Sequence, residues 1–117
     1  MPTIARTRLA AAILAIAASA AACGGGEREA ETFSIVVPAG TQDRLLAGEV
    51  VEVMPERIEL RVGDRVVIRN DDEVIQAVGP YVVDAGDEIT FTYGAPGVYE
   101  GFCALSASQT YEIVVER

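Results

Sequence analysis

The sequence predicts an all-β domain, an antiparallel sandwich or barrel, on three observations. Charged and apolar residues alternate without a fault over residues 57–62, which predicts a strand with one wet face and one buried face. Short segments of this kind recur at regular spacing between turns rich in Gly, Pro and Asp. Residues 41–48 are the one segment suited to a helical turn. Many short strands with almost no helix are typical of sandwiches and barrels.

The candidate strands follow one another along the chain. Residues 33–37 are apolar and end at Pro38-Ala39-Gly40. The strand at 57–62 continues through Gly63-Asp64 into the apolar segment 65–69, and this arrangement predicts a hairpin. Further strands are expected at 74–78, 88–93, 98–103 and 110–116, with Gly79-Pro80, Ala85-Gly86-Asp87 and Gly94-Ala95-Pro96-Gly97 as turns.

The 117 residues allow one domain with an N-terminal appendage. Residues 1–22 are predicted to be a signal peptide, because Arg6 and Arg8 precede an alanine-rich apolar segment. That segment is shorter than a membrane span of about 20 residues. Residues 23–32 are mostly small or charged and are expected to form a flexible tether. Residues 33–117 are then the folded domain.

The sequence Ala20-Ala21-Ala22-Cys23-Gly24 resembles the lipobox of bacterial lipoproteins. The resemblance implies that Cys23 becomes the new N-terminus and carries a diacylglyceryl group. The protein would then be exported and anchored through membrane lipid to the outer face of a bacterial membrane, at the cell surface or in the periplasm. Two alternatives stay open: ordinary cleavage after an Ala-x-Ala stretch, which leaves Cys23 as a thiol, and a membrane-spanning anchor helix.

The acidity of the chain limits its partners. Without residues 1–22 it holds 7 arginines, no lysine and 18 acidic residues, a formal net charge of −11. Such a surface repels nucleic acid and anionic lipid headgroups. A protein partner guided by electrostatics is therefore expected to be basic, although solubility of an exported domain is the simpler explanation of the charge.

The sequence contains no histidine. This absence excludes Ser-His-Asp and Cys-His catalysis and the usual metal-hydrolase ligand sets. No glycine-rich phosphate loop falls within residues 33–117 either. We therefore do not expect an enzyme.

Three motifs occur in a fixed order over the second half of the chain. The first is Val62-Gly63-Asp64 with Asn70, the second Ala85-Gly86-Asp87, and the third Pro96-Gly97-Val98-Tyr99, which Cys103 follows. In this order they resemble the cupredoxin family, the plastocyanin-like copper proteins. The first strand with Val37-Pro38-Ala39-Gly40-Thr41, and the Gly79-Pro80-Tyr81 step, resemble an exported bacterial branch of cupredoxin-like proteins. The resemblance implies an antiparallel Greek-key β-sandwich or barrel.

The resemblance also implies where copper ligands would lie. The first histidine position is Gln76, the thiolate position is Cys103, and the second histidine position is Ser106. No methionine follows Cys103, and Met54 lies far upstream. Copper prefers imidazole and sulfur to amide and hydroxyl oxygens. We therefore expect no intact metal site and no cofactor, with copper bound through Cys103 and non-standard ligands as the alternative.

Cys103 and the acidic run Asp71-Asp72-Glu73 each allow two interpretations. A packed, inert thiol is favoured for Cys103, because reactive cysteines need an electropositive setting. A redox-active thiol or an intermolecular disulfide is the alternative. A solvated turn is favoured for the three acids over weak Ca²⁺ binding.

The aromatic residues are expected to serve mainly as packing. Tyr81, which follows Gly79-Pro80, is expected to be the best exposed of them. The others fall at strand positions and are interpreted as core residues or cross-strand pairs: Phe91, Tyr93, Tyr99, Phe102 and Tyr111.

These observations lead to a functional expectation. The chain is interpreted as a membrane-tethered cupredoxin-like domain without a complete type 1 copper site, acting as an interaction, structural or accessory module of the cell envelope. The alternatives are a copper-binding electron-transfer protein ligated through Cys103 and a thiol-based redox partner. The sequence does not identify the partner, the particular membrane or the oligomeric state.

Overall fold

The computed structural model of the protein describes residues 28–117. The predicted signal peptide and Cys23 lie outside these residues. Within residues 28–117 the chain forms eight strands and one short helix, so the all-β prediction is confirmed. In the same part of the chain, no helix has the length and apolar character needed to cross a membrane.

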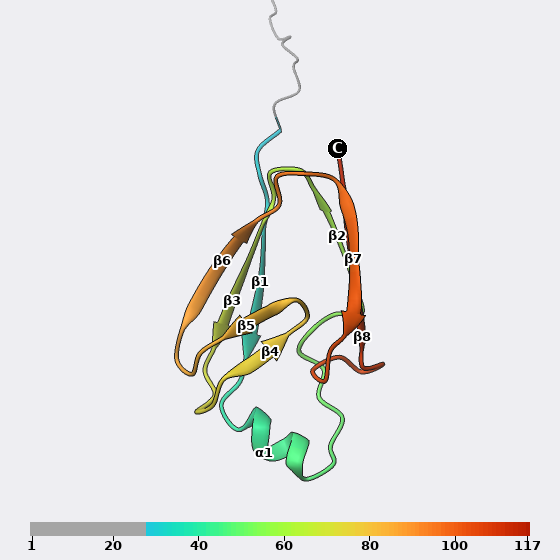
Figure 1. Cartoon of the computed structure of the whole chain (residues 1–117). Coiled ribbons are helices and arrows are strands. Elements are labelled where there is room, and N and C mark those ends of the chain that lie inside the picture. Colours follow the sequence, from blue (N-terminus) through green and yellow to red (C-terminus); the bar gives the residue numbers. More distant parts are fainter. Residues whose placement is uncertain (1–27) are drawn as a thin grey trace, which may run out of the picture.

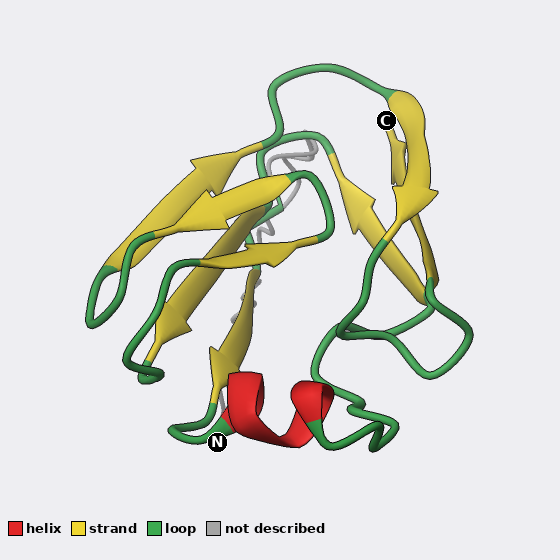
Figure 2. Cartoon of the chain, turned by 60° about the horizontal axis from the view of Figure 1, so that its bottom comes forward, coloured by secondary structure: helices red, strands yellow, loops and turns green. Residues whose placement is uncertain are grey.

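Two three-stranded sheets face each other as a sandwich (Figure 1). The first sheet has the order β1 (Thr32–Val37), β3 (Arg65–Asn70), β6 (Glu88–Thr92), and the second has the order β2 (Arg57–Arg61), β8 (Thr110–Glu116), β7 (Gly97–Phe102). β4 (Gln76–Val78) and β5 (Tyr81–Val83) form a separate antiparallel pair. The helix α1 (Thr41–Leu46) lies at one end of the sandwich, in the region that Figure 2 brings forward.

The alternating pattern places apolar side chains between the sheets. In β2, Ile58 and Leu60 are buried, while the charged residues that alternate with them are exposed. They stand in register with Ile113 and Val115 of β8, which are buried as well. The buried apolar residues form one cluster: Ile35, Val37, Val51, Met54, Ile58, Leu60, Val66, Ile68, Val78, Tyr81, Val83, Tyr93, Cys103, Leu105, Ile113 and Val115. Burial of these side chains is the main favourable contribution to folding.

The predicted hairpin across Gly63-Asp64 is wrong. β2 belongs to the sheet of β8 and β7, and β3 belongs to the sheet of β1 and β6, so the turn carries the chain from one sheet to the other. In consequence β1 pairs with β3, and β2 with β8, in parallel. The β3–β6 and β7–β8 pairs are antiparallel. The sheets of the sandwich are therefore mixed and not purely antiparallel.

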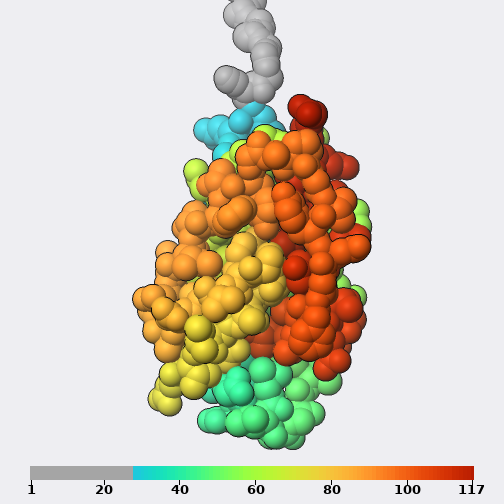
Figure 3. Space-filling view, in the orientation of Figure 1, coloured from blue at the N-terminus to red at the C-terminus, as the bar shows by residue number. Residues whose placement is uncertain are grey.

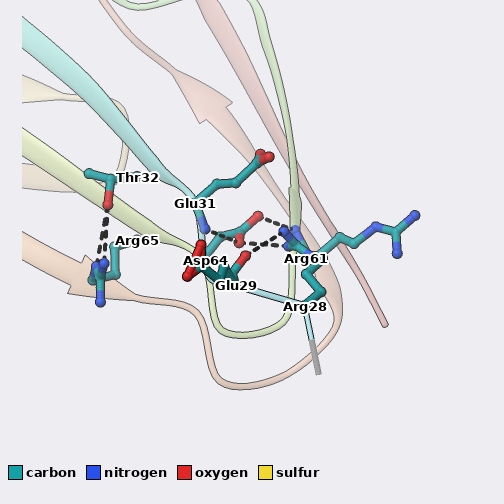
Figure 4. Close-up of polar contacts among 7 residues, drawn as sticks. All are labelled: Arg28, Glu29, Glu31, Thr32, Arg61, Asp64 and Arg65. Carbon is teal, nitrogen blue, oxygen red and sulfur yellow. Dashed lines mark hydrogen bonds and ion pairs between the residues drawn. The ribbon is translucent and has the colours of Figure 1, made fainter. Parts of the chain in front are cut away.

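Asp64 organises this crossing (Figure 4). Its carboxylate is buried, with 2 % of the residue exposed, and accepts hydrogen bonds from the backbone N–H groups of Arg61 (2.8 Å) and Glu31 (2.9 Å). The guanidinium of Arg28 completes the cluster at 2.7 Å. Arg28 and Glu31 belong to the predicted tether. The last residues of that segment are thus attached to the domain in this structure.

The same contacts shift the pKa of Asp64. Burial of the carboxylate acts to raise its pKa. The two backbone N–H donors and the Arg28 guanidinium stabilise the charged form and outweigh burial, so the pKa lies below its ordinary value. The charged carboxylate therefore stabilises the folded chain.

The aromatic residues differ from the expectation at two positions. Tyr81 is 6 % exposed, not the most exposed aromatic, because its hydroxyl forms a buried hydrogen bond with that of Tyr93. Phe91 and Tyr99 pack around Tyr93, with ring centroids 4.8 and 5.4 Å from it. Phe102, expected to pack, is 69 % exposed. The sequence does not predict β5, because three residues after Pro80 are too few to show a period.

Replacement of Asp64 with Asn should lower the free energy of unfolding near neutral pH. Because the folded-state pKa is depressed, the contribution of Asp64 is complete above its ordinary value of about 3.8 and is lost as pH falls through the folded value. Below that window, Asp64→Asn and the natural chain should differ little. Urea unfolding measured from pH 2 to pH 7 checks this, with Glu29→Gln, an exposed carboxyl of the same segment, as the control. An equal loss at every pH would contradict the assignment.

Candidate functional site

Asn70 shapes the loop that leads to the first predicted ligand position. It is fully buried at the end of β3. Its side-chain amide donates to the carbonyl oxygens of Val74 (2.9 Å) and Val83 (3.0 Å), and its carbonyl oxygen accepts from the N–H of Asp72 (2.9 Å). The loop between β3 and β4 is therefore closed by one side chain, which fixes where β4 begins.

Asp72 ties this loop to the helix. Its carboxylate accepts from the backbone N–H groups of Gly40 (3.0 Å) and Gln42 (2.8 Å). These groups belong to the N-terminal end of α1, where backbone donors lack partners within the helix. Asp72 also accepts from the N–H of Glu73 at 2.9 Å. It thus caps a helix that lies about 30 residues away along the chain.

The solvated-turn interpretation is wrong for Asp72, which is 5 % exposed. Burial acts to raise the pKa of this carboxyl, but the hydrogen bonds that it accepts outweigh burial, and the pKa lies below its ordinary value. Asp71 is exposed and pairs with Arg69. Among residues 28–117, no cluster of three or more Asp, Glu, Cys or His residues is arranged to hold a metal ion.

Gln76, at the first histidine position, is also buried, with 5 % exposed. Its side-chain N–H group donates to the Asp72 carboxylate at 2.8 Å and approaches the side-chain oxygen of Gln42 at 3.3 Å. Gln42 belongs to α1, and Asp72 is the carboxylate that caps this helix. The amide at position 76 therefore serves as a structural hydrogen-bond donor to a buried carboxylate.

Cys103, at the thiolate position, is a free cysteine and is 2 % exposed. Its sulfur accepts a hydrogen bond from the backbone N–H of Gly79 at 3.3 Å. Its own N–H donates to the carbonyl of Gln109 at 3.0 Å, which closes the loop before β8. Burial in the core agrees with the packed-thiol interpretation.

Ser106, at the second histidine position, is 2 % exposed. Its N–H donates to the carbonyl of Cys103 at 3.2 Å, so the two positions share one tight turn. Its hydroxyl lies 3.5 Å from that of Ser108. Ser106 also lines a cleft of about 540 Å³ between the end of α1 and the 104–109 loop, whose lining includes neither Gln76 nor Cys103.

The structure brings a further sulfur atom, that of Met54, close to the Cys103 loop, although Met54 is remote from the other candidate ligands in sequence. The N–H groups of Val53 and Met54 both donate to the carbonyl of Leu105 at 2.8 Å, and this brings the segment against the Cys103 loop. A β-carbon built on Gly79 would lie 2.9 Å from the terminal methyl carbon of Met54 and 3.6 Å from its sulfur. The thioether and the Cys103 thiol thus both lie against Gly79. The one hint in the sequence is that Met54 is the only methionine of residues 23–117.

These donors do not fit a type 1 copper ion. Such a site takes two imidazoles and a thiolate. The chain offers no imidazole, Gln76 is engaged by Asp72, and Ser106 presents a hydroxyl. The sulfur atoms of Cys103 and Met54 are the donors here that suit copper, and they suit its soft Cu(I) form.

The chain is similar to solved structures of other proteins. No family model and no curated protein matches the chain. Among solved structures, it is similar to a novel purple cupredoxin from Nitrosopumilus maritimus, with 26% identity over 72% of this chain and 99% of that one and a TM-score of 0.45. It is also similar to a mutant of amicyanin in its Cu(I) form, with 15% identity over 77% of this chain and 87% of that one and a TM-score of 0.46. These structural neighbours are cupredoxins.

Replacement of Gly79 with Ala should lower the free energy of unfolding by about 2–5 kcal/mol. Gly79 has φ of 58°, a left-handed conformation that costs other residues about 1–2 kcal/mol. The new methyl group would also press on Met54, and overpacking typically adds about 1–3 kcal/mol.

Gly86→Ala is the matched control. Gly86 has φ of 76° and open space at the β-carbon position, so it should show the backbone cost alone. Chemical denaturation of both variants measures the difference. Equal losses would mean that Met54 is not packed against Gly79.

Proposed function

We propose that this protein is a membrane-tethered cupredoxin-like domain that lacks a type 1 copper site and serves as a non-catalytic interaction or structural module of the cell envelope. The observation that carries the proposal is the contact of Gln76 with Asp72 at 2.8 Å. At the position where a copper ligand is expected, the side chain instead joins the hydrogen bonds that hold α1 and the 70–76 loop.

The proposed anchor is the acylated Cys23, which makes membrane lipid one partner. Cys23 stands five residues before Arg28 in sequence. The start of β1 lies at the end of the sandwich opposite α1 (Figure 1). Arg28, four residues before β1, forms an ion pair with Asp64 of the turn between β2 and β3. A domain tethered at this end, outside the membrane, would present α1 and the three remnant ligand positions away from the lipid.

The charge of the chain supports a basic protein partner and argues against nucleic acid. Without the predicted signal peptide the formal net charge is −11, and with no histidine to titrate the chain stays acidic over the physiological pH range. Like-charged polymers are repelled by such a surface. A basic protein is attracted to it, and the attraction should weaken with added salt.

A second candidate function is supported by the sulfur pair at Gly79. Cys103 accepts the Gly79 N–H, and the Met54 thioether contacts the same residue. Thiolate and thioether are the ligands that Cu(I) prefers. This arrangement would favour a Cu(I)-binding protein with Cys103 as its main ligand, in place of a blue-copper electron carrier.

Copper titration separates the two candidates. The purified protein should show no saturable one-to-one binding of Cu(II) and no intense thiolate-to-copper absorption, because no imidazole is present. Cu(I) is titrated separately against a competing chelator, with Cys103→Ser as the control. Tight Cu(I) binding that Cys103→Ser abolishes would replace the first candidate with the second, and a blue Cu(II) complex would contradict both.

The double substitution Gln76→His with Ser106→His tests the remnant positions themselves. A histidine at 76 has two ring nitrogens, so one can donate to Asp72 while the other binds metal. If Gln76, Cys103 and Ser106 converge, the double variant should bind Cu(II) with strong thiolate-to-copper absorption, which a further Cys103→Ser change removes. A folded double variant that binds no Cu(II) would mean that the ligand positions were misassigned.

A further inference from the structure

Strand β7 leaves one backbone edge unpaired. In the order β2-β8-β7 it is the outermost strand of its sheet, and its partner on the other side is β8. Residues 97–102 make no other backbone hydrogen bond with the described part of the chain. An edge of this kind presents N–H and C=O groups to which a strand of another molecule can be added.

The side chains of β7 do not protect this edge. Val98, Glu100 and Phe102 occupy alternate positions and so share one face of the strand, with Val98 58 % and Phe102 69 % exposed. Proteins usually guard free edges with charged residues. β2, at the opposite edge of the sheet, follows that rule, because its exposed positions are Arg57, Glu59 and Arg61. β7 carries one charge between two apolar side chains.

That charge is not compensated within the described chain. Glu100 stands directly opposite Glu112 of β8, and like charges in this position repel. The nearest cation in the same row is Arg57, which contacts both Glu112 and Glu59. Glu100 itself forms no ion pair within residues 28–117.

A hollow beside β7 gathers more negative charge. Three carboxylates and one guanidinium line it, and its lining is Glu56, Arg57, Glu100, Gly101, Thr110, Tyr111 and Glu112. Figure 3 shows the β7 residues, in orange, at the surface next to the yellow β4–β5 pair. The free edge, the apolar side chains and the negative charge thus occur together on one accessible part of the molecule.

We propose that β7 binds an extended, basic segment of a partner protein, which adds to the sheet as a further strand. Its Arg or Lys side chain pairs with Glu100, and apolar side chains two positions to either side cover Val98 and Phe102. The proposal rests on the proposed function as an interaction module and names the kind of partner that the module takes.

Charge complementarity selects this occupant over a second copy of the chain. Two β7 strands side by side would bring two Glu100 side chains, each already opposed by Glu112, into the same row. Without the predicted signal peptide, each copy also carries a formal net charge of −11. Repulsion therefore opposes self-pairing, whereas a basic segment relieves it.

The test uses two synthetic peptides, Ser-Val-Thr-Arg-Thr-Val-Ser and the same sequence with Glu in place of Arg, both capped at their ends. Their symmetric pattern allows the central residue to face Glu100 in either strand direction. The Arg peptide should bind the purified protein at least about fivefold more tightly than the Glu peptide. Amide NMR should show shift changes and slowed hydrogen exchange concentrated in residues 97–102.

Glu100→Arg should reverse the preference between the two peptides. Glu88→Arg, the same change on the edge strand β6 of the other sheet, should leave it unchanged. Both positions are exposed, so the amide spectrum of each variant should remain that of the folded protein.

Three results would overturn the proposal: equal binding of both peptides or of neither, unchanged β7 amides, or sedimentation of the free protein as a dimer that Glu100→Arg alters. None of these bears on copper binding. A failed peptide experiment and a failed copper titration therefore remain distinguishable.

Discussion

The buried carboxylate of Asp72 is the constraint on which the site end of the molecule depends. It joins three segments that are separate in sequence: the start of α1 through Gly40 and Gln42, its own loop through Glu73, and β4 through Gln76. A buried charge is tolerated only when it is fully hydrogen-bonded, and four donors meet that condition. Loss of any one donor leaves the carboxylate less satisfied, so the hydrogen bond from Gln76 contributes to the stability of the fold at this end.

Cys103 and Met54 are held by hydrogen bonds with the backbone. The Cys103 sulfur accepts from the N–H of Gly79, and the Cys103 N–H donates to the carbonyl of Gln109. The Met54 N–H donates to the carbonyl of Leu105, two residues after Cys103. Packing and these hydrogen bonds hold the Cys103 thiol in the core. At the two predicted histidine positions the chain carries an amide, Gln76, and a hydroxyl, Ser106. At the other end of the sandwich, the Asp64 carboxylate accepts hydrogen bonds from the backbone N–H groups of Glu31 and Arg61, and so holds the segment before β1 against the end of β2.

Sequence patterns predict most of the strands, because period-2 alternation and Gly-Asp or Pro-Gly turns are local signals. They fail where the outcome depends on distant partners. Gly63-Asp64 has the same local pattern whether the chain folds back or crosses to the other sheet, and the crossing is set by Asp64 bonds to Arg28 and Glu31. The burial of Asp72 depends on donors at Gly40 and Gln42, which lie in another segment.

The exposure of Tyr81 and Phe102 differs from the expectation because it also depends on distant partners. Tyr81 is buried with its hydroxyl hydrogen-bonded to that of Tyr93. Phe102 is exposed because it belongs to β7, an edge strand. The predicted ligand positions Gln76, Cys103 and Ser106 came from the family resemblance. No local pattern would have predicted that Met54 lies against Gly79 and the loop after Cys103.

The most direct test of this account is a double-mutant cycle between Asp72 and Gln76. The free energy of unfolding is measured by urea denaturation for Asp72→Ala, Gln76→Ala and the double variant. If the amide at 76 is a structural partner of the carboxylate, the double variant should lose clearly less stability than the sum of the two single losses. The pair Asp64→Ala and Gln76→Ala, on separate networks, should add. Strict additivity for Asp72 and Gln76 would contradict the claim that position 76 has become part of the framework.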